Sequence, residues 1–525
     1  MLRILGVDND SVNQGWLCDK GRYNFEYLNS ETRIKTPLKK LNNNFEEVEM
    51  QEVYSEISEL IKNENTKVNF YLGSNLTNED FVAFREFANS ISNNDNKFYL
   101  NDDVLFPGFF NEDVELGKID DLNNSDAIVI WAEDLKERLP VLYLRVRQAV
   151  KNGVKLIVFG HTNRTLDDVA EIFYSDEVVS ENSEIIKDLT KLEDFKSLTV
   201  EKNVTAIIGK STPQQSDSSI NKLFDFLNSN SNLKILNAFT KGNTYGAFQI
   251  LDNLKGTKDF VNEINSENTD LLFVVAADPI GRSIYSKQVK KVFDEIKTVV
   301  SLDNFKHETS ELADVIVPIS STLGEKNGTF TNIEFRTSRI DKLVPSPGQT
   351  VSDWEFITSL MNFSGLSNNS YSLEELNTKA FEDLDIELKP YFDNLDKPSN
   401  LDGIINRTTP KIATSSSDSE KVNFFIGEKL YGDSVTERNS ESISLLGAKK
   451  FIEMNQETVD KFKLSSGNCL LEQDNLEINV SYTVNNILPK GTIYIPTNRR
   501  ELNKFDFSKK IMITPSRVKE ALNVN

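Results

Sequence analysis

Residues 127–160 read AIVIWAEDLKERLPVLYLRVRQAVKNGVKLIVFG. The runs AIVIW (127–131) and KLIVFG (155–160) are apolar, of strand length and without alternation, which is typical of strands buried on both faces. Between them, VLYLRVRQAVK carries apolar residues at helical spacing, with Pro140 at the first turn and Gly153 where a C-terminal cap belongs. A strand, a helix and a second strand predict a right-handed parallel crossover.

The same alternation of apolar strand and helix extends from residue 66 to residue 320. Further runs of strand length stand at NFYLG (69–73), TAIIG (205–209), KILNAF (234–239), LFVVA (272–276) and VVSL (299–302). Several consecutive units of this kind predict doubly wound parallel sheets with helices on both faces. The expected fold class is therefore α/β.

The composition excludes several classes of function. A chain of 525 residues is too long for one compact core, so several domains are expected. With 59 basic and 81 acidic residues the formal charge is −22, which disfavours nucleic acid and anionic lipid as partners. Two cysteines suit a reducing cytosol. The start MLRILGVDND has no signal-peptide core and the longest apolar run, LLFVVAA (271–277), is too short to cross a bilayer, so direct membrane insertion is not expected.

The composition and hydrophobic pattern of the sequence divide the chain into four predicted parts. Residues 1–40 form a short, turn-rich N-terminal module, and residues 41–400 hold the α/β domains. The polar stretch NRTTPKIATSSSDSE (406–420) indicates a linker at 401–421. From 422 to 525, short apolar runs such as GTIYIP and KIMITP, punctuated by Gly, Pro and Asn, predict a small β-barrel.

Two apparent cofactor signals are weak. Gly-Lys-Ser-Thr at 209–212 follows a predicted strand, but Val204 stands where a phosphate-binding loop needs its first glycine, so a plain strand-to-helix turn is favoured. No Gly-x-Gly-x-x-Gly follows a predicted strand. The two histidines, His161 and His307, have no other metal ligands at useful spacing, and both are expected to be loop residues without chemistry.

Two other segments are typical of binding sites. In ADVIVPISSTLGEKNGTFTNIEFRTSRID (313–341) a short strand ends at Pro318, and the turn GEKNG (324–328) then leads to the polar side chains of TFTN (329–332). Such a turn can offer backbone N–H groups to an anionic or heteroaromatic ligand, or it can be an ordinary loop held by its own Asn and Thr hydrogen bonds. In NQGWLCDKGRY (13–23), Cys18 looks like the end of an iron–sulfur motif, although a cubane cluster normally takes four thiolates.

These segments, together with GSNLTNEDFVAFREFA (73–88), LPVLYLRVRQAVKNGVKLIV (139–158) and VPSPGQTVSDWEFITSLM (344–361), resemble the molybdopterin oxidoreductase family. The resemblance is closer to its branch of G subunits in bacterial NADH-quinone oxidoreductase, respiratory complex I, and it includes a C-terminal dinucleotide-binding β-barrel. It implies that Cys18 is the fourth ligand position of a [4Fe–4S] cluster and that Lys20 matches the lysine between cluster and pterin. The positions that it implies near the pterin are Asn243, Gly246, Glu325, Gly328, Thr329 and Asn332.

The sequence departs from the family pattern at three places. The three cysteines expected before Cys18 are missing, so a 4Fe–4S cluster is expected only if an upstream segment or a partner supplies them. The central domains contain no cysteine that could bind molybdenum. The family's Glu-Gly-Arg after Asn332 is here Glu334-Phe335-Arg336, and a phenylalanine obstructs a close backbone approach that a glycine allows. Molybdopterin is therefore not expected.

The resemblance and these departures together favour a structural role. They imply a scaffold subunit in the electron-input arm of an NADH-quinone oxidoreductase, without its own molybdenum site. Its partners would be other peripheral-arm subunits, which would hold this cytoplasmic chain at the inner face of the cell membrane. The alternative is a catalytic molybdenum- or tungsten-pterin oxidoreductase that acts on a small substrate and uses Asp or Ser as the metal ligand. A third interpretation treats Met1 as an artificial start, so that the chain is part of a longer subunit.

Overall fold

The structure is a computed structural model. It describes residue 1 and residues 3–63, 65–91, 96–101, 115–131, 134–160, 164–174, 189–209, 217–367, 371–384, 421–447, 451–488, 490–507 and 509–516. Several predictions concern residues outside these ranges. They are those for His161, for residues 210–212 of the Gly-Lys-Ser-Thr segment, for residues 401–420 of the linker and for the last residues, 517–525.

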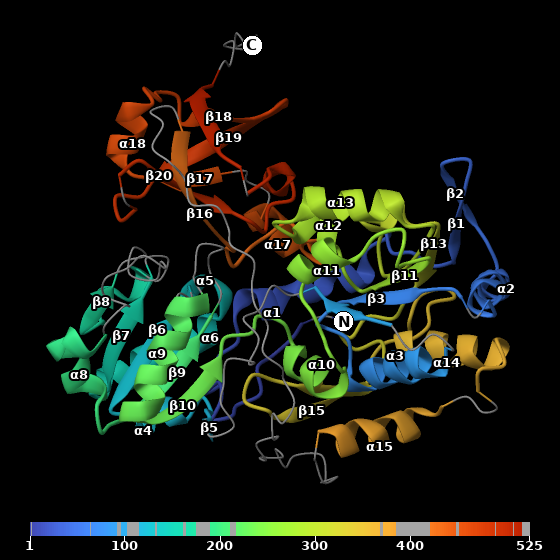
Figure 1. The fold of residues 1–525 in the computed structure, drawn as a ribbon, viewed down its shortest axis with the longest axis horizontal. Coiled ribbons are helices and arrows are strands. Elements are labelled where there is room, and N and C mark those ends of the chain that lie inside the picture. Colours follow the sequence, from blue (N-terminus) through green and yellow to red (C-terminus); the bar gives the residue numbers. More distant parts are fainter. Residues whose placement is uncertain are drawn as a thin grey trace.

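Seven strands form the first sheet, in the order β2-β1-β13-β12-β11-β3-β4 (Figure 1). They are β1 Leu38–Leu41, β2 Asn44–Glu47, β3 Val68–Leu72, β4 Phe98–Leu100, β11 Leu271–Val275, β12 Thr298–Asp303 and β13 Val315–Pro318. The strands from β13 to β4 pair in parallel, and the β1–β2 hairpin adds to one edge in the antiparallel sense. Every residue of β3 and β11 is buried, because helices cover both faces.

Alternate residues of the first sheet enter two separate cores. One core joins the sheet to α2 (Met50–Ile61), α3 (Asn78–Ser90), α10 (Thr244–Ile250), α14 (Asp353–Phe363) and α15 (Leu373–Asp383). The other core joins it to α11 (Thr257–Glu263) and α13 (Ser286–Glu295), which follows the short α12 (Pro279–Arg282). Figure 1 shows these two sets of helices on opposite sides of the sheet.

Six parallel strands form the second sheet, in the order β5-β10-β9-β6-β7-β8. They are β5 Glu115–Leu116, β6 Ala127–Trp131, β7 Lys155–Phe159, β8 Ile172–Tyr174, β9 Asn203–Ile208 and β10 Asn232–Asn237. Helices α4 (Asp121–Asn124), α5 (Leu135–Arg138) and α6 (Pro140–Lys151) cover one face. Helices α8 (Glu193–Thr199) and α9 (Asp217–Asn230) cover the other.

The predicted α/β fold is confirmed, and all seven predicted strands are present. Helix α6 begins at Pro140, and Gly153 follows its C-cap residue with a φ of 106°, which suits glycine. The strands are shared between two sheets, which the strand pattern did not reveal. The chain leaves the first sheet after β4, builds the second from β5 to β10, and returns to the first at β11.

The C-terminal part forms a closed barrel in the order β16-β20-β17-β19-β18-β21. Its strands are β16 Lys421–Gly427, β17 Phe451–Met454, β18 Asn468–Gln473, β19 Leu476–Val484, β20 Thr492–Pro496 and β21 Ile511–Pro515. Three helices accompany them, α16 Val435–Arg438, α17 Glu441–Gly447 and α18 Gln456–Lys461. Apolar side chains from all six strands fill the interior.

The N-terminal segment connects these parts. It contains α1 (Asp19–Tyr23) and the 3-10 helix η1 (Asn24–Asn29), which lie at the centre of the molecule in Figure 1. Hydrogen bonds from Tyr27 N–H to Ser440 Oγ (3.2 Å) and from Ser442 N–H to Glu26 Oε2 (2.7 Å) join this segment to α17 and the residue before it. In the part of the chain that the structure describes, no helix has the length and apolar character needed to span a bilayer.

Candidate functional site

The first candidate site forms where β3 ends and α3 begins. Thr77 and Asp80 make a capping box, in which the Thr77 hydroxyl accepts the Asp80 N–H (3.1 Å) and the Asp80 carboxylate accepts the Thr77 N–H (2.8 Å). The two residues between them, Asn78 and Glu79, are fully buried. Asn78 Nδ2 donates to the Thr329 hydroxyl (3.0 Å), and Glu79 accepts both the N–H and the hydroxyl of Thr329 (2.8 Å each). The start of α3 is therefore bonded directly to β14 (Gly328–Thr331).

Asn243 and Gly246 reach the same place from the start of α10. Asn243 Oδ1 accepts the Thr331 N–H (2.7 Å), and its Nδ2 donates to the Leu76 carbonyl (2.8 Å). A Cβ on Gly246 would lie 2.0 Å from Asn78 Oδ1 and 2.3 Å from Asn243 Oδ1, so a larger residue would displace these two side chains. The structure thus brings together four of the predicted residues, Asn243, Gly246, Gly328 and Thr329.

Asn332 and Phe335 shape the turn between β14 and β15 (Thr337–Ile340). Asn332 Oδ1 accepts the N–H groups of Glu334 and Arg336 (2.9 and 3.0 Å). Phe335 has a φ of 61°, in the left-handed region that bulky side chains rarely adopt. Its ring is buried against Tyr245, with 4.1 Å between the ring centroids. This aromatic contact offsets a backbone strain of about 1–2 kcal/mol.

Replacing Phe335 separates the ring's contribution from the backbone strain. Phe335→Gly should lower the free energy of unfolding by about 2–3 kcal/mol, because the lost ring burial exceeds the relieved strain. Phe335→Ala should be less stable than Phe335→Gly by about 1 kcal/mol, since alanine keeps the strain and also lacks the ring. Urea unfolding measures both values. An alanine variant at least as stable as the glycine variant would contradict the left-handed backbone.

Lys326 lies buried behind this site, between two carboxylates. Its Nζ is 2.5 Å from Oδ2 of both Asp80 and Asp353, and all three residues are buried. Burial raises the pKa of Asp353 to about 7 against the opposing effect of Lys326, and the charge of Asp80 adds to the rise. The Lys326 ammonium group therefore pairs with two carboxyl groups. Near neutral pH, the Asp353 carboxyl group is protonated in a fraction of the molecules.

Glu325 is engaged by the N-terminal part of the chain. It forms a bidentate pair with the guanidinium of Arg33 (3.0 and 2.7 Å) and accepts the Ser321 N–H (2.8 Å). Both side chains of the pair are almost fully buried. Glu325 therefore fastens the loop after β13 to residue 33, and both its carboxylate oxygens are used in doing so.

Cys18 and Lys20 contact the N-terminal and C-terminal parts rather than the group around Asn243. Cys18 is the N-cap of α1, where its Sγ accepts the Gly21 N–H (3.4 Å), and Lys20 pairs with Glu437 of α16 (2.9 Å). The second cysteine, Cys469, is buried in the barrel, and burial raises the pKa of its thiol to about 12. Within the described ranges, no group of three or more His, Cys, Asp or Glu residues could hold a metal ion.

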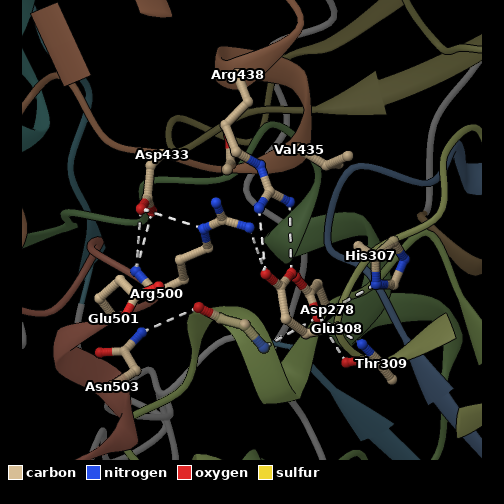
Figure 2. A network of polar contacts seen from close by, with 12 residues as sticks. Asp278, His307, Glu308, Thr309, Asp433, Val435, Arg438, Arg500, Glu501 and Asn503 are labelled. Carbon is tan, nitrogen blue, oxygen red and sulfur yellow. Dashed lines mark hydrogen bonds and ion pairs between the residues drawn. The ribbon is translucent and has the colours of Figure 1, made fainter. Parts of the chain in front are cut away.

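His307 lies in the loop after β12, as the sequence predicted, and its side chain is buried and paired with carboxylates. The imidazole is buried between Asp303 (Nε2–Oδ2, 3.0 Å) and Asp278 (Nδ1–Oδ1, 3.2 Å). The Thr309 hydroxyl also donates to Asp278 (2.6 Å) (Figure 2). Burial lowers the pKa of His307, but the two aspartates outweigh it and raise that pKa well above its ordinary value. Three buried charges thus meet at the carboxyl ends of β11 and β12.

Glu308, the next residue, joins this cluster to the C-terminal part. Figure 2 shows the guanidinium groups of Arg438 and Arg500 converging on its carboxylate, at 3.2 and 2.8 Å. Arg500 N–H also donates to Asp433 (3.0 Å), and Asn503 Nδ2 donates to the Gly281 carbonyl (3.1 Å). The C-terminal part is therefore held to the segments that follow β11 and β12 by charged and polar bonds.

Several residues of the site were not predicted. They are Asn78, Glu79, Asp80, Tyr245, Lys326, Asp353, Asp278 and Asp303. One signal was available for the first three, because Thr77-x-x-Asp80 after a predicted strand is the pattern of a capping box at a helix start. The partners of Lys326 and His307 come from distant segments, and no local pattern identifies them.

The sequence profile of the molybdopterin oxidoreductase family matches residues 33–363. The chain belongs to the molybdopterin oxidoreductase family. It is 23% identical to the F420-dependent formate dehydrogenase subunit alpha of Methanocaldococcus jannaschii over 476 residues, which covers 74% of this chain and 70% of that one. It is 24% identical to the NADH-ubiquinone oxidoreductase 75 kDa subunit of Reclinomonas americana over 412 residues, covering 72% of this chain but only 56% of the relative.

A solved structure of the same overall fold is acetylene hydratase from Pelobacter acetylenicus. Its TM-score is 0.61 at 13% sequence identity, and the match covers 91% of this chain and 87% of that one. At this identity the likeness concerns the fold alone. The relatives named above are subunits of larger oxidoreductases by their names, and the chain spans only part of their length.

The residues at the pterin-type positions fit a pterin nucleotide poorly. The polar atoms of Asn243, Thr329 and Glu325 are bonded to the chain itself. The buried Ser74 Oγ and Asn78 Oδ1 have no hydrogen-bond partner, but neither carries the positive charge that a phosphate prefers. The Phe335 ring packs against Tyr245, which lies between Asn243 and Gly246 in the sequence. No reaction step is therefore assigned to a pterin in this chain.

Proposed function

We propose that this chain is a structural subunit, or a portion of one, in the electron-input arm of an NADH-quinone oxidoreductase, and that it holds no molybdenum site. The observation that carries this proposal is that Thr329 and Asn243, at two of the pterin-type positions, are bonded to Glu79 and Thr331 of the same chain. Tyr245, two residues after Asn243, packs against the ring of Phe335. The likeness to a 75 kDa subunit supports the assignment to this kind of complex. The proposed partners are other peripheral-arm subunits, which would keep the chain at the inner face of the cytoplasmic membrane.

The same proposal assigns roles to the remaining predicted residues. Cys18 is a ligand of a 4Fe–4S cluster only where an upstream segment or a partner provides the other three thiolates. The pterin-type positions, with Lys20, are vestigial. The division into a module at 1–40, α/β domains at 41–400, a linker at 401–421 and a barrel at 422–525 is part of this proposal. Strand β1 (Leu38–Leu41) spans the first of these boundaries.

A second candidate is a catalytic molybdenum- or tungsten-pterin oxidoreductase. The observation that favours it is the likeness to a formate dehydrogenase alpha subunit over 74% of the chain. It requires a metal ligand other than cysteine, because residues 41–400 contain no cysteine. The poor fit of the pterin-type positions places this candidate second.

Metal analysis and partner capture test the two candidates together. The tagged full-length chain, produced in a host that makes pterin cofactors, should contain molybdenum and tungsten far below one atom per chain. Captured from its native host, it should bring with it subunits that oxidise NADH. Stoichiometric molybdenum or tungsten with co-purifying formate oxidation would reject the structural role and support the second candidate.

A further inference from the structure

Two lobes form the body of the molecule, the first built on the seven-stranded sheet and the second on the six-stranded sheet. They contact each other where the loop after β5 meets the turn between β14 and β15. Ile119 of that loop donates its N–H to Glu334 Oε1 of the turn at 2.6 Å, in a buried position. Ile333 of the same turn packs against the cores of both lobes. The relative position of the lobes therefore depends on this contact.

The N-terminal segment reaches the second lobe through a compact turn at residues 9–15, which we name the N-terminal turn. The carbonyl of Asn9 accepts the N–H groups of residues 12–14 at 2.9–3.1 Å. The Asn13 side chain closes the turn, because its Oδ1 accepts the Asn9 N–H (3.1 Å) and its Nδ2 donates to the Val7 carbonyl (2.8 Å). The N-terminal turn is therefore held in shape by hydrogen bonds within the N-terminal segment itself.

Arg145 of α6 connects the N-terminal turn to the second lobe. Its side chain is only 2% exposed. Nη1 donates to the Asp10 carbonyl (2.9 Å), while Nη2 donates to Asp120 Oδ1 (3.3 Å) and lies 3.5 Å from the Ser11 carbonyl. Val12 of the turn packs against the core that α6 covers. A buried guanidinium needs acceptors for its N–H groups, so the docked turn helps to hold the Arg145 side chain in place.

Asp120 places this guanidinium next to the contact between the lobes. It directly follows Ile119, whose N–H is bonded to Glu334. One buried side chain thus bonds both to the N-terminal turn and to the loop that contacts the first lobe. If the turn leaves, Arg145 loses its carbonyl acceptors and must turn toward water, and its bond to Asp120 is then lost as well.

We propose that the N-terminal turn and the contact between the lobes open and close together through Arg145, so that this turn controls how firmly the second lobe is held to the first. The inference goes beyond the proposed function, because it concerns motion within this chain in any assembly. By linkage, a partner that binds the turn in its docked form also strengthens the contact between the lobes.

The test is hydrogen exchange in the full-length chain, measured at residues 118–122, which include the Ile119 amide. Asn13→Ala removes hydrogen bonds that lie within the N-terminal segment and leaves the second lobe unchanged in sequence. It should raise the exchange rate at 118–122 by at least about fivefold, because the turn then opens more often. Arg145→Met should give an equal or larger rise. The double variant should not exceed the larger single effect, since both substitutions break the same connection.

Arg147→Met is the matched control, because Arg147 lies on the same helix and pairs with the exposed Asp168 (2.8 and 2.7 Å). It should leave exchange at 118–122 at the wild-type rate. Exchange in β6 and β7 should stay slow in every variant, which separates opening of the contact from unfolding of the second lobe. Unchanged exchange at 118–122 in Asn13→Ala overturns the proposal, even if Arg145→Met raises it, because Arg145 then acts within the second lobe alone. Asn13→Ala decides the question without Arg145→Met if the latter fails to fold.

Discussion

Replacing Lys326 with methionine is expected to lower the free energy of unfolding by about 3–5 kcal/mol, because it leaves the buried carboxyl groups of Asp80 and Asp353 without a cation. The loss should be larger at pH 8 than at pH 5.5. At the lower pH the Asp353 carboxyl group, whose raised pKa is about 7, takes up a proton, so less unpaired buried charge remains. Urea unfolding at the two pH values measures the difference.

The wild-type chain should show the related pH dependence with a smaller amplitude. The native pKa of Asp353, at about 7, lies above that of an unfolded aspartate, so the native state binds the proton more tightly. This contribution to stability is complete below about pH 4 and is lost as the pH rises to about 7. Asp353→Asn should remove it and should restore part of the stability of Lys326→Met. Lys490→Met, at a surface lysine, should change stability by less than about 0.5 kcal/mol. If Lys326→Met lost the same free energy of unfolding at pH 5.5 and at pH 8, protonation of Asp353 near neutral pH would be contradicted.

The strands and the strand–helix–strand unit at residues 127–160 were predictable because the sequence signals for them are local. The apolar runs AIVIW and KLIVFG, with Pro140 and Gly153 between them, fix a strand–helix–strand unit without information from elsewhere in the chain. Assignment of each strand to a sheet was not predictable in this way. Strands β3 and β11 are neighbours although about 200 residues separate them, and only their shared burial between two helical layers brings them together.

The candidate site was predictable to the extent that its residues lie in sequence motifs. The segment 324–332 was predicted to be either a binding-type turn or a loop held by its own hydrogen bonds. In the structure Thr331 N–H donates to Asn243, and Asn332 accepts the Glu334 N–H. Buried charges escaped prediction for a physical reason. A buried lysine or histidine is stabilised by carboxylates from other parts of the fold, as His307 is by Asp278 and Asp303. The spacing of residues in the sequence does not predict such contacts.

His307→Gln is expected to lower the free energy of unfolding by about 3 kcal/mol at pH 6, because two buried aspartates then lose their shared cation. The pH dependence of wild-type stability follows from the shifted pKa values of His307 and Asp278. The raised pKa of His307 gives stability that is complete below about pH 6.5 and is lost as the pH rises through the raised value. His307 outweighs the effect of burial and holds the pKa of Asp278 well below its usual range, which gives stability that is lost as the pH falls below about 4.

The stability of the wild-type chain should therefore decline above about pH 6.5 by an amount that His307→Gln lacks. A double-mutant cycle with Asp303→Asn isolates the direct contact, and a coupling free energy of at least about 1 kcal/mol is expected. Because Glu308 lies next to His307 and binds Arg438 and Arg500, loss of the buried imidazolium should also loosen the C-terminal part from the loop after β12. Hydrogen exchange at residues 433–440 reports this loosening. Additive effects of the two substitutions, with unchanged exchange there, would show that His307 acts neither through Asp303 nor on the barrel contact.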